Sequence, residues 1–279
     1  MRVSFCLLAA ISLSYVAAGR SRSDSFQFAV MGDRTGEAQP GVYEEVWQAV
    51  AKEKPNFVVS VGDTIQGLND GTALGEWEQI ENKLLPYKTI PLYLAPGNHD
   101  IWSERSEALF KRFSHHAPHY SFDFEQLHVT VLDTSRSDNL SDAEMRFLED
   151  DLKAHAQQPL KIVVSHRPFW LLPVLFGMTQ SPVHQLLLRY GVRFVFTGHL
   201  HKMFHAEMDG ITYVCMPSAG GHLRDTKEYD DGWFFAHTLV RVTGQRLTMT
   251  IEEIGPPVGK GRVTTIDDWG VAGLVKKAA

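Results

Sequence analysis

Short apolar runs alternate with amphipathic helical patterns between residues 26 and 196, and this alternation limits the fold more than any other feature of the sequence. The apolar runs have the length and composition of buried strands. They occupy residues 26–31, 57–61, 91–95, 128–132, 160–164 and 192–196, and the helical patterns lie near residues 41–53, 73–84, 103–113, 141–155 and 182–190. One helix has a capping-box start, with Ser141 as N-cap and Glu144 three residues later. The alternation predicts an α/β fold.

The pattern changes after about residue 200, where strand-like segments follow one another without helices. Asp209 and Gly210 lie between two of these segments and predict a hairpin turn. We therefore expect one α/β domain over residues 24–255 that closes with an antiparallel section. Residues 256–279 begin rich in Gly and Pro and are expected to form a peripheral C-terminal tail.

Five of the predicted strands are each followed directly by a residue that can bind a metal ion. These residues are Asp33, Asp63, Asn98, His166 and His199, with His201 two residues beyond the last of them. Taken alone, such an Asp is usually part of a turn or cap, and a single His is usually a satisfied interior or surface residue. Because α/β sheets place their sites at the carboxyl ends of strands, the five together predict one shared site.

The chemistry of these side chains favours a metal centre. Carboxylate, amide and imidazole groups suit hard or borderline ions, and no thiolate accompanies them to select a soft one. The six candidate ligands exceed what one tetrahedral ion needs. A carboxylate such as Asp63 can bridge two ions roughly 3.5–4 Å apart, an arrangement suited to in-line displacement.

The motifs GD, GD, GNHD, H and GHLH, in this order, resemble the calcineurin-like metallophosphoesterase superfamily, which includes the purple acid phosphatases. The resemblance implies a four-layer α/β/β/α sandwich, with two sheets between layers of helices. It also implies a hydrolase that cleaves phosphoric mono- or diesters of phosphorylated small molecules. Its cofactors would be two divalent or trivalent metal ions, with Fe, Mn and Zn as the candidates.

The resemblance also implies roles for individual residues. A hydroxide held between the two ions would attack phosphorus, and His99 would protonate the leaving oxygen as general acid. Asp63 would bridge the ions. Asp33 and His201 would hold one ion, and Asn98, His166 and His199 would hold the other.

Two positions depart from the family pattern. Thr35 stands where many members have a further His ligand, and Gln66 stands where purple acid phosphatases have a Tyr ligand. The first metal site is therefore expected to be poor in ligands. This leaves open a non-enzymatic secreted binding protein that keeps a degenerate metal site, although retention of His99 favours an enzyme.

Residues next to the candidate ligands have two possible roles each. Arg34 and Arg167 can bind substrate phosphate as planar forks or pair with surface carboxylates. His222 can line the pocket or lie in a solvated loop. The apolar segment 168–178 can cap the pocket for an apolar leaving group or pack on the core, and packing is favoured.

The N-terminal sequence predicts a cleaved secretory signal over residues 1–18, because an apolar run follows Arg2 and ends in small residues. We therefore expect a secreted or periplasmic protein with no membrane span after cleavage. Removal of Arg2 and Cys6 would leave 26 of the 27 Lys and Arg residues against 33 Asp and Glu residues. The resulting net charge of −7 argues against a nucleic-acid-binding surface. Cys215 alone would remain, so no intrachain disulfide is expected.

Overall fold

The computed structural model describes residues 25–269, and the predicted signal segment lies outside them. One six-stranded sheet contains β1 (Ser25–Met31), β2 (Val58–Ser60), β3 (Leu92–Leu94), β10 (Ala236–Thr243), β11 (Arg246–Glu253) and β12 (Val263–Thr265). Its strand order is β12-β11-β10-β1-β2-β3. The three N-terminal strands run parallel, and the three C-terminal strands add to β1 in antiparallel fashion.

The second sheet also has six strands and mixes the two orientations. It contains β4 (Tyr120–Phe124), β5 (Leu127–Val131), β6 (Leu160–Val164), β7 (Phe194–Thr197), β8 (Phe204–Met208) and β9 (Ile211–Cys215), in the order β4-β5-β6-β7-β9-β8. Strands β5, β6, β7 and β9 are parallel, and β4 and β8 pair antiparallel at the edges. The turn between β8 and β9 contains Asp209 and Gly210, as the sequence predicts.

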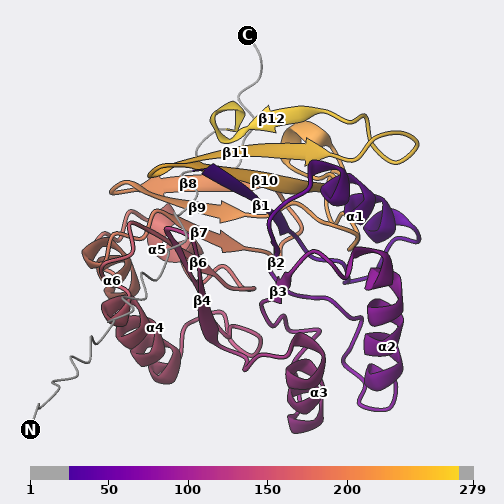
Figure 1. The fold of residues 1–279 in the computed structure, drawn as a ribbon, viewed down its shortest axis with the longest axis horizontal. Helices are drawn as coiled ribbons and strands as arrows, with labels where there is room; N and C mark the ends of the chain where they lie inside the picture. The colour runs from indigo at the N-terminus through magenta and orange to yellow at the C-terminus, as the bar shows by residue number, and fades with distance from the viewer. Residues whose placement is uncertain (1–24, 270–279) are drawn as a thin grey trace, which may run out of the picture.

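Helices cover the outer face of each sheet, and Figure 1 shows the two groups on opposite sides of the strands. On one side lie α1 (Val42–Glu53), α2 (Ala73–Leu84) and α3 (Glu104–Ser114), and on the other lie α4 (Asp142–Ala154), α5 (Leu171–Leu175) and α6 (Pro182–Arg189). Three 3-10 turns, η1 (Leu85–Tyr87), η2 (Tyr229–Asp231) and η3 (Ile266–Asp268), complete the regular structure. The four-layer α/β/β/α sandwich is confirmed.

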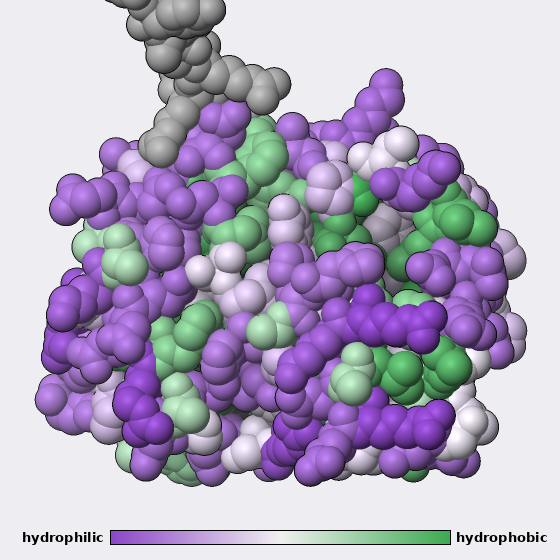
Figure 2. Space-filling view, turned by 60° about the horizontal axis from the view of Figure 1, so that its bottom comes forward, coloured by the Kyte–Doolittle hydropathy of each residue, from purple (hydrophilic) through white to green (hydrophobic). Residues whose placement is uncertain are grey.

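Apolar side chains fill each of the three spaces between these layers. In β1, Phe28 and Val30 point into the core between the sheets, whereas Ala29 and Met31 point toward the helices on the outer face. A third cluster joins the second sheet to α4, α5 and α6. Because both faces of the central strands are buried, their sequences read as continuous apolar runs rather than alternating ones. Hydrophilic side chains cover most of the face in Figure 2, with hydrophobic residues in separate patches.

The predicted start of α4 is confirmed in part. The Ser141 hydroxyl accepts a hydrogen bond from the Glu144 backbone N–H at 3.2 Å, as an N-cap should. The Glu144 side chain does not close a capping box. Instead its Oε2 accepts from the backbone N–H of Asp133 at 3.0 Å, and its Oε1 lies 2.6 Å from His119 Nδ1. The carboxylate thus links the helix start to the end of β5.

Three parts of the fold depart from the sequence prediction. The edge strand β4 and the short helix α5 were not predicted. The tail is not peripheral over residues 263–269, because β12 extends the first sheet. The Trp269 side chain is buried and packs against the rings of Tyr229 and Phe234, with centroids 5.5 and 5.2 Å away. This aromatic contact holds the end of the described chain against the core. No helix within residues 25–269 is both long and apolar enough to cross a membrane.

His237 in β10 provides a test of the packing. Its ring is buried, neither ring nitrogen makes a hydrogen bond, and the nearest carboxylate oxygen, of Glu252, is 3.7 Å away. Burial lowers the pKa of His237 to about 4, from 6.5. The unfolded chain therefore binds a proton between these two pH values that the folded chain does not, and stability falls as pH drops below about 6.5.

We predict that His237 alone lowers the free energy of unfolding by about 2 kcal/mol at pH 5 relative to pH 7.5. His237→Phe should remove this contribution, so the variant should gain stability over the wild type at pH 5 and gain much less at pH 7.5. Urea unfolding at both pH values measures the difference. An equal effect at the two pH values would show that packing alone, and not a buried neutral imidazole, decides the outcome.

Candidate metal centre

The carboxyl ends of five strands meet at one edge of the two sheets and bring all six candidate ligands together. From the first sheet come Asp33 after β1, Asp63 after β2 and Asn98 after β3; from the second come His166 after β6, with His199 and His201 after β7. His166 is central, since its Nε2 lies 3.1 Å from Asn98 Oδ1, 3.2 Å from His199 Nδ1 and 3.3 Å from Asp63 Oδ2. The convergence predicted from the strand ends is thus present in the fold.

The ligand atoms form two overlapping groups. Asp33, Asp63 and His201 make one, and Asp63, His166 and His199 make the other; within each group the atoms lie within 4.8 Å of one another. Asp63 belongs to both. The Asn98 amide oxygen, beside His166, adjoins the second group.

Two buried polar atoms in this cluster show that it suits cations. Asp63 Oδ2 and His201 Nε2 are fully buried, and neither makes a hydrogen bond to protein. Buried polar atoms in folded proteins almost always have a partner, so two acceptors that face one cluster in this way suit a cation. Oxygen and imidazole donors in this number fit Zn, Mn or Fe ions.

Backbone carbonyls orient two of the imidazoles. His166 Nδ1 donates to the Val61 carbonyl at 2.9 Å, and His201 Nδ1 donates to the His222 carbonyl at 2.8 Å. Each hydrogen bond fixes the ring and leaves Nε2 directed at the cluster, as outer partners of metal-bound histidines do. His222 thus contributes its carbonyl, while its own ring is bonded to the Gly36 carbonyl at 2.6 Å.

The electrostatics of the cluster favour bound positive charge. Burial opposes a charged His166, but the carboxylates of Asp63 and Asp33 outweigh it and raise the pKa of His166 to about 9. Burial also opposes ionisation of Asp63, yet the charge and proximity of His166 hold the pKa of Asp63 well below its usual range. The Asp63 carboxylate and its neighbours thus attract positive charge, and a bound metal ion would compete with a proton for His166.

The other histidine of this group is poised as a neutral ligand. Burial, together with the charges of His166, Arg167 and Arg224, lowers the pKa of His199 to about 3. Burial likewise lowers the pKa of His201. Neutral imidazole is the form that binds metal ions.

Asp100 is a residue of the site that our sequence analysis missed. Its buried carboxylate accepts hydrogen bonds from the backbone N–H groups of Thr64 at 2.8 Å, Ile65 at 3.2 Å and Gly97 at 2.9 Å. These bonds tie the loop after β2 to the loop after β3, and so fix Asp63 relative to Asn98. The signal was present in the sequence as the last residue of GNHD.

The backbone around the ligands is strained and closely packed. Asp63, His199 and His201 all have positive φ, of 56°, 69° and 58°, which is uncommon for residues other than glycine and frequent at functional sites. Gly97 and Gly198 allow the close approach, because a Cβ would lie 2.1 Å from Asp63 Oδ1 at the first and 2.5 Å from Asp33 Oδ2 at the second.

The two positions that depart from the family pattern are bonded to each other. The buried Thr35 hydroxyl donates to Gln66 Oε1 at 2.6 Å, and the Glu37 backbone N–H donates to the same oxygen at 3.2 Å. The neighbouring His99 is half-buried, its ring Nδ1 donates to the Gln66 carbonyl, and its backbone N–H donates to Asp63 Oδ1 at 2.9 Å. Gln66 therefore braces the edge of the cluster through both its side chain and its backbone.

The predicted substrate-binding arginines already have protein partners. Arg34 Nη1 donates to the Thr64 carbonyl at 3.0 Å, and Arg167 Nη1 lies 2.6 Å from Asp138 Oδ1. The Asp138 pair fits the alternative of a surface ion pair, and a role in substrate binding stays a prediction. Arg224, which the sequence analysis did not single out, has an exposed side chain whose charge acts on both His199 and His201.

A third group of possible ligands lies elsewhere. Asp123, His128 and His155 gather near the start of β5, at the opposite edge from the strand ends. Both nitrogens of His128 already have carboxylate partners, Asp123 Oδ1 at 2.7 Å and Asp151 Oδ2 at 2.9 Å. His128 is the only fully buried member of the group, and its polar atoms are satisfied without an ion.

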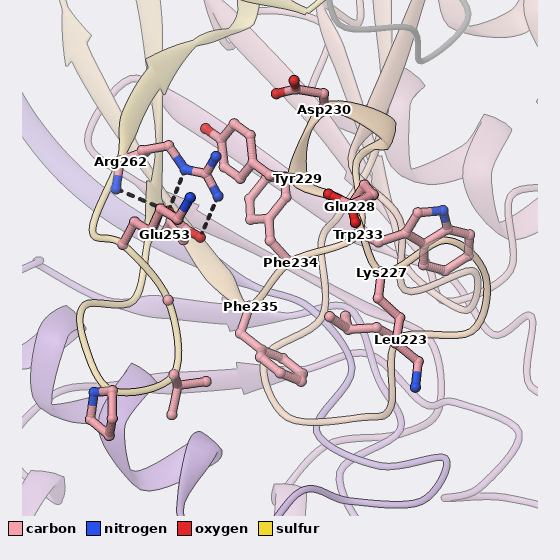
Figure 3. Close-up of a pocket in the computed structure, with 14 residues that line it drawn as sticks. Leu223, Lys227, Glu228, Tyr229, Asp230, Trp233, Phe234, Phe235, Glu253 and Arg262 are labelled. Carbon is pink, nitrogen blue, oxygen red and sulfur yellow. Dashed lines mark hydrogen bonds and ion pairs between the residues drawn. The ribbon is translucent and has the colours of Figure 1, made fainter.

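A hollow of about 490 Å³ is also separate from the cluster (Figure 3). Arg262 lines it, but the guanidinium Nε and Nη2 each lie 2.8 Å from the Glu253 carboxylate. The same guanidinium lies 3.3 Å from the centroid of the Tyr229 ring. Its charge is thus already neutralised, and none of the six candidate ligands lines this hollow.

Two stacked sheets whose carboxyl ends share such a cluster define a class of protein, the metallophosphoesterase fold. The purple acid phosphatase PPD1 from yellow lupin (Lupinus luteus) seeds has this fold, with a TM-score of 0.67 and 16% identity over 86% of this chain and 53% of its own. A dimetal phosphatase from Danio rerio gives a TM-score of 0.61 and 12% identity, over 86% of this chain and 98% of its own. GAP50, the anchor in the inner membrane complex of Plasmodium, gives a TM-score of 0.62 and 15% identity, over 91% of this chain and 90% of its own. These identities establish the fold alone.

The chain belongs to the calcineurin-like phosphoesterase family, whose model matches residues 26–203. Among its relatives, the serine/threonine-protein phosphatase CPPED1 of Mus musculus is 27% identical over 222 residues, or 70% of each chain. That of Danio rerio is 27% identical over 201 residues, which cover 64% of this chain and 65% of the relative. The chain thus spans about two thirds of the length of these relatives. Family membership and the names of these relatives support metal-dependent phosphoester hydrolysis.

Gly97 provides a test of how tightly the centre is built. In Gly97→Ala, the new Cβ would lie 2.1 Å from Asp63 Oδ1 and 2.3 Å from the Asp63 backbone nitrogen. The Asp63 backbone cannot avoid this clash by a change of rotamer, so Asp63 as a whole must shift. We predict lower metal content and about a hundredfold loss of phosphoesterase activity, measured by elemental analysis and turnover of an aryl phosphate.

Gly75→Ala is the matched control. Gly75 is an exposed residue of α2 with no atom within 4 Å of its added Cβ. This variant should keep its metal and activity and gain up to about 1 kcal/mol of stability. Wild-type metal content and activity in Gly97→Ala would show that the close approach is not required.

Proposed function

We propose that the protein hydrolyses phosphoesters at a binuclear metal centre. The observation that carries the proposal is the position of Asp63, which belongs to both groups of ligand atoms and has a buried oxygen without a protein partner. A carboxylate shared in this way suits two cations roughly 3.5–4 Å apart. In the proposal, Asp63 bridges the ions, Asp33 and His201 hold one, and Asn98, His166 and His199 hold the other.

Two bound ions, of Fe, Mn or Zn, would supply a hydroxide nucleophile and neutralise charge that develops on the phosphoryl oxygens. The chain's own part is to fix the ligands before substrate arrives. The Val61 and His222 carbonyls set the rings of His166 and His201, and Asp100 ties together the two loops that hold Asp63 and Asn98. Such preorganisation is a large part of what a protein contributes to catalysis.

His99 is the proposed general acid. Donation from its Nδ1 to the Gln66 carbonyl fixes the ring, so in the imidazolium form the Nε2–H group can pass its proton to the leaving oxygen and leave a neutral Nδ1–H ring. Its backbone N–H bond to Asp63 keeps it beside the proposed bridging carboxylate. The ring thus both braces the loop and has a free nitrogen for proton transfer.

Arg167 and Arg224 are the proposed contacts for substrate phosphate. Arg167 directly follows the candidate ligand His166, and Arg224 Nη2 and the His201 ring both border the space beside Gly36. A guanidinium suits phosphate because its planar fork donates two parallel hydrogen bonds. Arg34 is less available, since it donates to the Thr64 carbonyl and its guanidinium lies 5.8 Å from the Tyr43 ring centroid.

A non-enzymatic binding protein with a degenerate metal site is the competing proposal. Its support is the Thr35–Gln66 hydrogen bond, in which two side chains at family ligand positions bind each other. The free nitrogen of His99 favours the enzyme. Metal analysis combined with turnover of a generic aryl phosphate separates the two, because the binding protein would hold metal without turnover.

We propose further that the protein is exported to a secreted or periplasmic location. The support is the pattern of residues 1–18. The mass of the protein recovered from the extracellular or periplasmic fraction tests this, with a chain that begins at Gly19 as the expected result. Retention of residues 1–18 in a cytoplasmic fraction would contradict it.

Because Asp63 would bridge both ions and Asp33 would bind only one, their substitution should have different effects on metal content. We predict that Asp63→Ala loses both ions and at least about a hundredfold of activity, because two cations would then face each other without a shared carboxylate. Asp33→Ala should keep the ion held by Asn98, His166 and His199. Metal stoichiometry by native mass spectrometry measures both; two ions per chain in Asp63→Ala would contradict the binuclear assignment.

The acid role of His99 predicts a dependence on the leaving group. An alkoxide needs a proton to depart, whereas nitrophenolate does not. His99→Asn should therefore lose about 10²–10⁴-fold on an alkyl phosphate and markedly less on nitrophenyl phosphate. Asn is the chosen replacement because its amide can still donate to the Gln66 carbonyl.

His99→Ala, which loses both the brace and the acid, completes the comparison. Metal content should be unchanged in His99→Asn, since His99 is not a ligand in the proposal. Equal losses on the two substrates, together with loss of metal, would instead assign His99 a purely bracing role.

A further inference from the structure

A cavity of about 430 Å³ lies directly beside the candidate centre and shares His199 with it. Most of its wall is apolar and comes from Pro168, Phe169, Leu171, Leu172, Pro173 and Leu200. The volume is within the range of small-molecule sites. His199 therefore belongs both to the proposed ligand set and to the wall of an apolar cavity.

The wall is held firmly by its buried neighbours. Phe169 and Trp170 are buried in the cluster that joins α5 to the second sheet, and Trp170 Nε1 donates to Thr197 Oγ1 at 3.2 Å. Leu172 of the same segment is 63% exposed, although it lines the cavity. The segment 168–178 thus packs on the core through some residues and lines the cavity with others. Packing on the core and capping the pocket, the two roles considered from the sequence, therefore do not exclude each other.

The charges around the cavity exclude a second anion site. Within the described part of the chain, no Lys or Arg lines it. Asp138, at its rim, lies 2.6 Å from Arg167 Nη1, so this carboxylate is paired and its charge is turned toward the arginine. Asn139 and His199 are the other polar residues of the wall, and neither supplies the fixed positive charge of a Lys or Arg. The mainly apolar wall therefore suits an uncharged apolar group, which leaves no buried charge unpaired.

We propose that this cavity binds the alcohol portion of the substrate, and that the substrates are phosphoesters of apolar alcohols, aryl or alkyl. The inference rests on the proposed function, since the phosphoryl group would occupy the metal centre. Because His199 borders both places, the ester substituent of a phosphoryl group at the centre lies within reach of the apolar wall. Burial of this substituent supplies the selectivity.

Binding of non-hydrolysable phosphonates to the metal-loaded protein tests the inference without turnover. Phenylphosphonate and methylphosphonate share the phosphonate group and differ in the apolar substituent. By isothermal titration calorimetry, we expect phenylphosphonate to bind at least about tenfold more tightly. In Leu172→Asn this preference should fall by about threefold or more, with methylphosphonate affinity unchanged.

Phe176→Asn is the matched control. Phe176 directly follows α5 and is 76% exposed, but it does not line the cavity. This variant should keep the full preference for phenylphosphonate. Leu172→Trp, which fills the cavity, should weaken phenylphosphonate and spare methylphosphonate.

Three outcomes would overturn the inference. Equal affinity of the wild type for the two phosphonates would reject the cavity as a binding site while metal content and turnover of aryl phosphate leave the proposed function intact. A loss in Phe176→Asn as large as in Leu172→Asn would move binding to the outer surface. Failure of the metal-loaded protein to bind either phosphonate, with no turnover, would reject the proposed function itself and the inference with it.

Discussion

The buried carboxylate of Asp63 is the group on which the rest of the site depends. One oxygen accepts the His99 backbone N–H, and the other is buried without a hydrogen bond. Since a buried charge is costly unless it is compensated, the surroundings of Asp63 must provide positive charge. The raised pKa of His166 reflects this demand. In the proposed enzyme the two cations supply this charge, and this need explains why ligands from both sheets gather around one oxygen.

A rigid frame keeps that carboxylate in place. Asp100 joins the loops after β2 and β3 through three backbone hydrogen bonds, Gly97 lets the second loop approach, and the Asp63 backbone itself has positive φ. The Thr35 backbone N–H also donates to the Asp63 carbonyl at 3.1 Å, which adds the loop after β1. Strained geometry of this kind persists only where its neighbours determine it from several sides. The chemistry is therefore carried by loops, but the loops are fixed by the sheets.

The sequence predicted the parts of this arrangement that depend on local pattern. Strands buried on both faces read as apolar runs, so the residues that follow them, such as Asp33 and His166, could be assigned to one edge. The bonds of Asp100 and the partnership of Thr35 with Gln66 join loops distant in sequence, and no local pattern encodes them. Strand β12 was missed because its residues are largely exposed and form no apolar run, unlike the equally short β2 and β3, and Trp269 is held by tertiary packing. The apolar wall beside His199 likewise required the folded chain, since segment 168–178 divides between core and cavity.

Anomalous X-ray diffraction from crystals of the metal-loaded protein tests the central claim most directly. Data collected on either side of the absorption edge of the bound metal locate each ion independently of the protein model used for phasing. The account predicts two peaks roughly 3.5–4 Å apart, with a carboxylate oxygen of Asp63 between them. A single peak within the cluster at full metal loading, or two peaks of which only one contacts Asp63, would contradict it.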